Sequence, residues 1–181
     1  LIQNTDRAIQ HCISSPIQRC VDTAALMIEG ADRTHKVVNT HTIEIVEQRL
    51  LVEPGSFVLD IQQAAPYFRK QGALGFINSF VNNALPGMKH PITGVFDVLE
   101  LLYHTHPTQH NGLSLAVSHD TILAAIVAVI SGNKQIEQSD WPDMMEGLFV
   151  WFEGEDFSNS KLKWIWRGQK HELVIKDFQN K

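Results

Sequence analysis

The sequence predicts an α/β protein in which a mixed, mainly parallel central sheet is flanked by helices on both faces. Two segments carry this prediction, because at residues 10–28 and again at residues 113–130 a short apolar strand runs straight into a helix. Strands that alternate with helices in this way are typical of parallel sheets covered by crossover helices. Alternating residues near the C-terminus add strands that can pair as a hairpin, which makes the expected sheet mixed.

The composition indicates one globular domain over residues 1–181. Of these residues 44% are hydrophobic and 19% are charged, enough apolar surface for a core and too much for a disordered chain. The formal net charge of -5 argues against nucleic acid as a partner. The longest apolar run, near residues 123–130, is far shorter than the roughly 18 to 20 residues of a membrane span, so no membrane is expected. Cys12 and Cys20 form no disulfide framework and leave the compartment open.

The first strand-to-helix unit begins with a strand over residues 10–15. Pro16 suits the first turn of the following helix, where its missing N–H costs nothing, and Ser14 or Ser15 can cap that turn. Gly30 predicts the end of the helix.

The middle of the chain is expected to be mostly helical. Residues 42–46 still alternate with period two, which indicates a half-exposed strand. Residues 60–102 have helical spacing interrupted by prolines and glycines, and we interpret residues 60–100 as a small helical cap insertion. Its aromatic side chains could touch a substrate, although packing is the expected use; they are Phe57, Tyr67, Phe68, Phe76 and Phe80.

The second unit has a buried strand over residues 113–117 and a helix over residues 122–130, which ends at Gly132 and Asn133. Further strands are expected at residues 147–152, 161–166 and 173–175, with a closing hairpin turn at Arg167-Gly168.

The strongest candidate site is Ser118-His119-Asp120, at the carboxyl end of the buried strand. Open α/β sheets bind ligands at that end, and a helix that starts near Thr121 presents unpaired N–H groups and a positive dipole end to an anion. The alternative is that Ser118 or Asp120 only caps the helix and that His119 is a core histidine. A Ser-His-Asp triad is a poor interpretation, because three adjacent residues cannot easily turn toward one another.

A second candidate lies at the other strand-to-helix turn, Ser14 to Arg19. The Arg19 guanidinium, one turn into the helix, is suited to grip a phosphate through two parallel hydrogen bonds. The alternative is a solvated arginine at a helix start. Both turns can face the same edge of the sheet, where they would supply a guanidinium, a histidine and an acid.

These motifs, in this order, resemble the histidine phosphatase superfamily and, more narrowly, its histidine acid phosphatase branch. The resemblance covers about residues 12–175, and its order along the chain makes it persuasive. The matching pieces are Ser14-Ser15-Pro16 with Arg19, Asp22-Thr23-Ala24, the helix around residues 94–99, His119-Asp120-Thr121, Asp140-Trp141-Pro142 before a strand at 148–153, and the hairpin Trp164 to Gly168.

The resemblance implies a phosphoglycerate mutase-like fold and a phosphomonoesterase that works through a phosphohistidine intermediate without a cofactor. Arg19 and His119 would bind the phosphoryl oxygens, and Asp120 would protonate the leaving alcohol. Glu53 loosely matches the acid of the mutase-like branch and ranks below Asp120; its alternative is a loop carboxylate. The implied partner is a phosphorylated small molecule, and a homodimer stays open. A periplasmic or secreted location is favoured over a cytoplasmic one.

One departure from the family affects the mechanism. The family's first strand ends in Arg-His-Gly, which carries the nucleophilic histidine, and this tripeptide does not occur in the 181 residues. Three explanations are open. Residues upstream of Leu1 could be missing from this sequence, the chain could be one piece of a processed polypeptide, or it could be a relative that binds phosphate without catalysis. In the family that strand is central, so its absence would leave two strand edges unpaired.

Two weaker patterns complete the candidates. His104, His106 and His110 have a spacing that could hold a metal, although a polar loop is the preferred interpretation and no metal is expected. Trp141, Trp151, Trp164 and Trp166 could form a surface that stacks on a ligand, but packing is the expected use.

Overall fold

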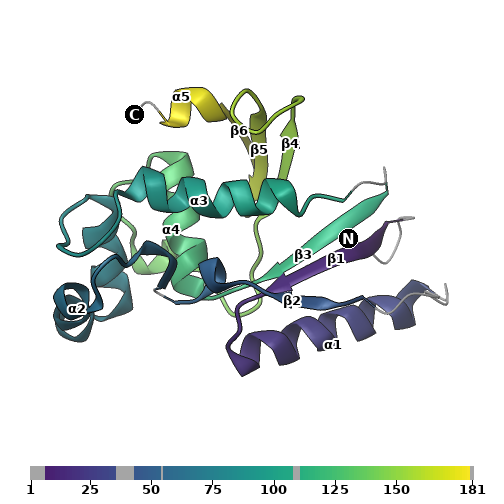
Figure 1. Cartoon of the computed structure of the whole chain (residues 1–181), viewed down its shortest axis with the longest axis horizontal. Helices are drawn as coiled ribbons and strands as arrows, with labels where there is room; N and C mark the ends of the chain where they lie inside the picture. The colour runs from purple at the N-terminus through teal and green to yellow at the C-terminus, as the bar shows by residue number, and fades with distance from the viewer. Residues whose placement is uncertain (1–6, 36–42, 54, 108–110, 180–181) are drawn as a thin grey trace.

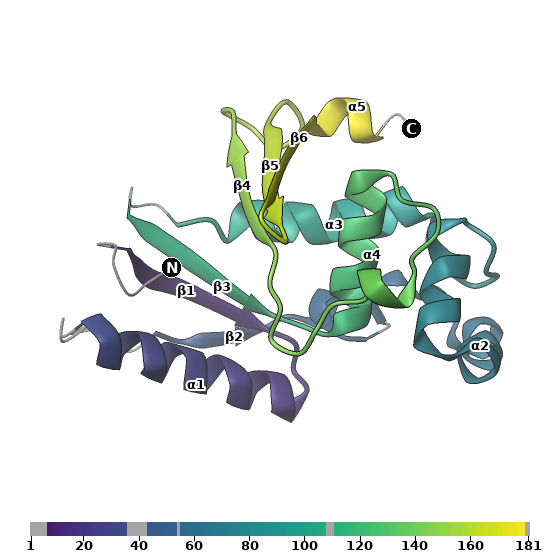
Figure 2. The ribbon, with the colours of Figure 1, turned by 180° about the vertical axis from the view of Figure 1, so that it is seen from behind.

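A computed structural model describes residues 7–35, 43–53, 55–107 and 111–179. Its first sheet has the order β2-β1-β3, formed by β1 (Ala8–Ser14), β2 (Ile45–Glu47) and β3 (Gly112–Val117). Both neighbours run parallel to β1, as the two strand-to-helix units predict. In Figures 1 and 2 the helices α1 (Gln18–His35) and α3 (Pro91–His104) lie on either side of this sheet.

The helix α1 continues beyond its predicted end at Gly30 and runs to His35. A glycine inside a helix costs only about 1 kcal/mol relative to alanine, so it stops a helix only when the following residues also favour a turn. Ala31 and the residues after it are compatible with a helix, and the prediction of a stop was therefore wrong. The predicted strand at residues 42–46 is also shorter, because pairing with β1 begins only at Ile45. Thr42 lies outside the described residues.

The helical middle of the chain contributes a large part of the core. It forms the 3-10 turns η1 (Arg49–Leu51) and η2 (Gly55–Phe57), then α2 (Ile61–Val81) and α3. Gly72 interrupts α2 with a φ of 67°, a conformation that other residues rarely adopt. Phe57 stacks on Phe80 with ring centroids 4.6 Å apart, and both are fully buried, so these aromatic residues pack as expected.

The helix α4 (Asp120–Ser131) follows β3 and ends at Gly132, as predicted. The prediction that this strand is buried was wrong, because the residues of β3 are half-buried and Ala116 is exposed. Gly132 has a φ of 73°, the left-handed conformation of a helix C-terminus. The core runs without a break from Ile13 in β1, through α4, to Phe178 in the short helix α5 (Ile175–Gln179). No helix in the described ranges is long and apolar enough to cross a membrane.

The C-terminal strands form a second, separate sheet with the order β4-β5-β6. These strands are β4 (Phe149–Glu153), β5 (Lys161–Trp166) and β6 (Gln169–Val174), all antiparallel to their neighbours, with the predicted hairpin turn at Arg167 and Gly168. The described strands therefore form one parallel and one antiparallel sheet, and not the single mixed sheet that the sequence predicts. Within the described residues β3 pairs only with β1, and β4 pairs only with β5. In both views β4 is the strand of its sheet nearest β3 (Figures 1 and 2).

Candidate functional site

The carboxyl ends of the three parallel strands meet at one edge of the sheet. Ser14 is in register with Glu47 of β2 on one side and with Val117 of β3 on the other. The Ser15 N–H donates to the Val117 carbonyl at 2.8 Å, and the Gln48 N–H donates to the Ser14 carbonyl at 2.7 Å. Three chain segments that are far apart in sequence therefore leave the sheet side by side, as parallel strands require.

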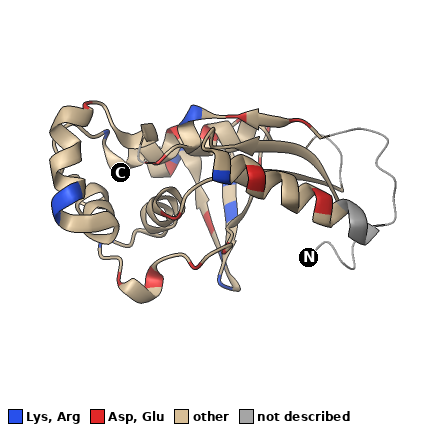
Figure 3. Ribbon diagram, turned by 90° about the horizontal axis from the view of Figure 1, so that it is seen from below, with Lys and Arg blue, Asp and Glu red and all other residues tan. Residues whose placement is uncertain are grey.

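This arrangement brings Arg19 and His119 into contact. Arg19 Nη2 lies 2.9 Å from His119 Nδ1, across a sequence separation of 100 residues. His119 is 6% exposed, whereas the Arg19 side chain is 69% exposed, so the pair opens to solvent at the arginine. Figure 3 shows basic and acidic residues interspersed along the described ribbon. The helix α4 starts directly after His119, and its positive dipole end adds to the local positive potential.

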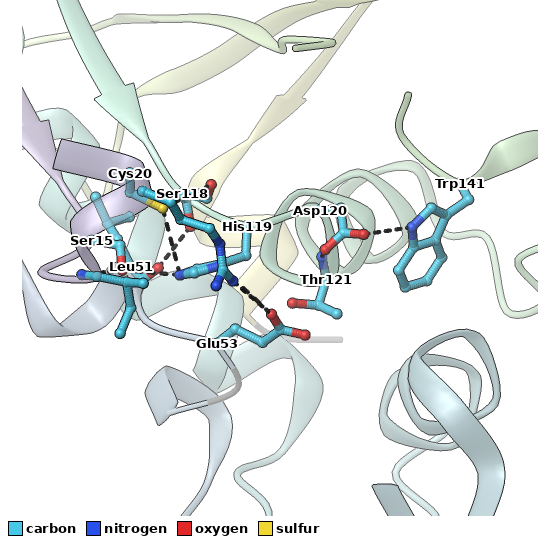
Figure 4. A network of polar contacts seen from close by, with 11 residues as sticks. Ser15, Cys20, Leu51, Glu53, Ser118, His119, Asp120, Thr121 and Trp141 are labelled. Carbon is cyan, nitrogen blue, oxygen red and sulfur yellow. Dashed lines mark hydrogen bonds and ion pairs between the residues drawn. The ribbon is translucent and has the colours of Figure 1, made fainter. Parts of the chain in front are cut away.

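Glu53 is the third charged group at this place. Its Oε2 lies 3.6 Å from His119 Nδ1 and 3.8 Å from Arg19 Nη2 (Figure 4). Glu53 follows η1, and the Ser118 hydroxyl ties η1 to the end of β3 by donating to the Leu51 carbonyl at 2.8 Å. The carboxylate that the sequence ranks second is thus the one beside the Arg19 and His119 pair.

Asp120 has a different orientation. One oxygen accepts the Trp141 indole N–H at 2.9 Å, and the other accepts the Thr121 N–H at 2.8 Å. Figure 4 shows the carboxylate turned toward Trp141, on the side away from Glu53. Trp141 is itself held by Arg167, which donates to its carbonyl at 2.9 Å. The structure therefore places the first-ranked acid next to His119 in sequence but directs its carboxylate elsewhere.

The environment of His119 favours the neutral imidazole. Burial is the largest cause and lowers the pKa of His119 below 6.5, and the nearby Arg19 charge lowers this pKa further. Glu53 and Asp120 act in the opposite direction on the same pKa without reversing its shift. An anion bound beside the ring would favour the protonated form, so this histidine can couple anion binding to proton uptake.

Ser15 and Cys20 also belong to the site, although the sequence pattern assigns neither of them a contact with His119. The Ser15 hydroxyl lies 2.9 Å from His119 Nε2, and it also accepts the Ile17 N–H at 3.4 Å as the predicted cap. Cys20 Sγ lies 3.8 Å from the same ring nitrogen and donates to the Ser118 carbonyl at 3.6 Å. Burial raises the pKa of Cys20, so this thiol is a poor nucleophile. Their positions at the same junction as Arg19 were the available signal.

The other candidates lie apart from this site. His104 ends α3, and a His106 ring nitrogen contacts the carbonyl of Tyr103. His110 lies outside the described residues, and the remaining described chain holds no group of three or more His, Cys, Asp or Glu residues arranged for a metal. Trp164 is 3% exposed and packs in the core rather than on a ligand surface.

The arrangement can bind an anion and exchange a proton. It offers one guanidinium, one imidazole and a helix N-terminus as a positive surface, with a carboxylate within 4 Å that can give or take a proton. Neither a scan against protein-family models nor a search of curated proteins finds a match to this chain. This geometry and the motifs of the sequence are therefore the observations that bear on its function.

Proposed function

We propose that Arg19 and His119 bind the phosphoryl group of a phosphate monoester, and that the protein is a phosphoric monoester hydrolase of the histidine phosphatase kind. The contact of 2.9 Å between Arg19 Nη2 and His119 Nδ1 carries the proposal. Arg19 and His119 lie after adjacent strand ends, beside the N-terminus of α4. Such donors can stabilise the negative charge that spreads over the phosphoryl oxygens during transfer.

The reaction also needs a nucleophile, which in this proposal is a histidine on an added strand of the phosphoglycerate mutase-like sheet. No Arg-His-Gly occurs in the 181 residues, so that strand would come from outside them. The open edges of β3 and β4, within the described residues, support this part of the proposal. A strand between them would join the two sheets into the single mixed sheet that the family resemblance implies.

In this proposal Glu53, rather than Asp120, protonates the leaving alcohol. A general acid must reach the reacting oxygen directly or through one water, and the Glu53 carboxylate is already 3.6 Å from the phosphate-binding imidazole. Asp120 would first have to release the Trp141 indole. In a preparation that contains the nucleophile, Glu53→Gln should slow the hydrolysis of esters with poor leaving groups more than Asp120→Asn does. The reverse order would assign the acid to Asp120.

The second candidate function is a phosphate-binding module without catalysis, which the absence of Arg-His-Gly from these residues favours. It uses the same Arg19 and His119 pair. Turnover separates the two functions: hydrolysis of a phosphate monoester by the protein with its nucleophile supports the enzyme, and phosphate binding without hydrolysis by that same protein supports the module.

The anion site itself is tested by thermal unfolding with inorganic phosphate, vanadate or tungstate. Each anion should raise the melting temperature of the wild-type protein, because a ligand that binds only the folded state stabilises it. Arg19→Ala should abolish this increase. Arg69→Ala is the matched control, since Arg69 is an exposed arginine of α2, and it should retain the full increase. An unchanged increase in Arg19→Ala would refute the proposed site.

A further inference from the structure

The hydroxyl of Ser15 contacts His119 on the opposite side of the ring from Arg19. Ser15 Oγ lies 2.9 Å from Nε2, and Arg19 Nη2 lies 2.9 Å from Nδ1; Cys20 Sγ at 3.8 Å from Nε2 and Glu53 Oε2 at 3.6 Å from Nδ1 are more distant. Ser15 is fully buried, and its backbone is fixed by the hydrogen bond to Val117 and by Pro16. Its hydroxyl therefore has a defined position relative to the ring.

The chemistry of these partners determines where the ring proton lies. A guanidinium donates hydrogen bonds and cannot accept them, so Nδ1 must be the unprotonated acceptor in its contact with Arg19. In a neutral imidazole the proton then lies on Nε2, and Nε2–H donates to Ser15 Oγ. The lowered pKa of His119, caused first by burial, agrees with a neutral ring.

The Cys20 thiol is the other group near Nε2, with its Sγ 3.8 Å from that nitrogen. The Cys20 thiol donates to the Ser118 carbonyl at 3.6 Å. The Cys20 thiol proton thus has its own acceptor, and Ser15 Oγ is the nearest acceptor for a proton on Nε2.

We infer that Ser15 is the positioning residue of this site: it accepts the Nε2 proton that the Arg19 contact requires, and together with Arg19 it holds the ring so that Nδ1 faces the incoming phosphoryl group. The role of the phosphoryl group rests on the proposed function, whereas the position of the proton does not. Ser15 accepts from Nε2–H in both charge states of the ring, so a bound phosphate contacts Nδ1. An unprotonated Nδ1 cannot donate a hydrogen bond to a phosphate oxygen, and Nδ1 must therefore take up a second proton when phosphate binds.

This geometry makes phosphate binding a proton-uptake event at one atom. The titratable and charged groups that face His119 are Arg19 and Cys20 from α1, Glu53 from the segment after η1, and Asp120 from α4. Arg19 and burial oppose the imidazolium and the two carboxylates favour it, so an added anion shifts the balance toward protonation. Phosphate affinity should therefore decrease as the pH rises above the range where the bound ring keeps both protons.

The experiment measures the tautomer of His119 by ¹⁵N NMR of the imidazole and the affinity for inorganic phosphate by titration. Wild-type protein without phosphate should show the Nε2–H tautomer, and phosphate should protonate Nδ1. Ser15→Ala leaves Nε2–H without its acceptor, so it should reduce the preference for the Nε2–H tautomer and weaken phosphate binding by about tenfold. Ser14→Ala is the matched control, because Ser14 is an equally buried serine whose hydroxyl donates to the Ser15 carbonyl and not to His119, and it should change neither result.

Two results would overturn the inference. The first is an Nδ1–H tautomer in the wild-type protein, which needs no variant and so holds even where Ser15→Ala fails to fold. The second is a Ser15→Ala protein whose tautomer and phosphate affinity equal those of Ser14→Ala. If the wild-type tautomer is Nε2–H and depends on Ser15 but phosphate binds neither protein, the positioning role is supported and the proposed function is the part that fails.

Discussion

Replacement of Glu53 by glutamine should strengthen the binding of inorganic phosphate. The Glu53 carboxylate lies 3.8 Å from Arg19 Nη2 and 3.6 Å from His119 Nδ1, so an anion held by both groups must lie close to a negative charge. Two unit charges about 4 Å apart repel by about 1 kcal/mol in water and by about 4 kcal/mol at an effective dielectric constant of about 20. The Glu53 side chain is 22% exposed and faces the solvent-exposed Arg19, so we take the value of about 1 kcal/mol, which corresponds to about fivefold in affinity. Because Glu53 also raises the pKa of His119, its removal opposes protonation of the ring, and about fivefold is therefore the upper limit of the gain.

The assay is isothermal titration calorimetry with phosphate at neutral pH and low salt. Glu100→Gln is the matched control, because Glu100 is an exposed residue of α3, and its substitution changes the net charge equally. The Kd should decrease in Glu53→Gln and stay unchanged in Glu100→Gln, and added salt should reduce the difference. A Kd in Glu53→Gln that equals or exceeds the wild-type value would refute the position of the anion between Arg19 and His119.

Three other predictions concern the described fold. Burial lowers the pKa of His119 in the folded state, so the unfolded chain binds a proton at a higher pH than the folded protein does. The free energy of unfolding should therefore fall as the pH drops below 6.5. Chemical denaturation at about pH 7.5 and about pH 5.5 should show a smaller decrease in this free energy for His119→Asn than for the wild-type protein. Burial raises the pKa of Cys12 to about 11, and Cys12 and Cys20 are 2% and 4% exposed, so both thiols should react with a disulfide reagent only after denaturant is added; fast labelling of the native protein would contradict this packing. Leu99→Ala in α3 should lower the free energy of unfolding by about 2 to 5 kcal/mol, whereas Leu26→Ala, at a position that is 68% exposed, should change it by about 0.5 kcal/mol or less.

Local signals predicted the parts of the fold that local chemistry controls. Gly132 ends α4 in the left-handed conformation, and Arg167-Gly168 turns the hairpin, because each turn depends on a few adjacent backbone angles. The same reasoning failed at Gly30, where the small cost of one glycine did not outweigh the continuing helix. It also did not predict that the described strands divide into two sheets, because periodicity does not encode which distant strands pair with one another.

For the candidate site, the sequence pattern alone places Arg19 and His119 after two strands and at the start of two helices. Parallel pairing of those strands makes the contact between the residues a direct consequence, since their carboxyl ends share one edge. The choice between Glu53 and Asp120 needed the tertiary structure.

The reason is that these carboxylates are directed by partners far away in the chain. The hydrogen bond from Ser118 to the Leu51 carbonyl brings Glu53 to the histidine, and the indole of Trp141 turns Asp120 away from it. Ser15 could be read as a helix cap from its position, but its hydrogen bond to a ring 104 residues later exists only after β1 and β3 pair. Spacing in the sequence thus determined which backbone positions meet, and side-chain contacts across the fold decided what each of them can do.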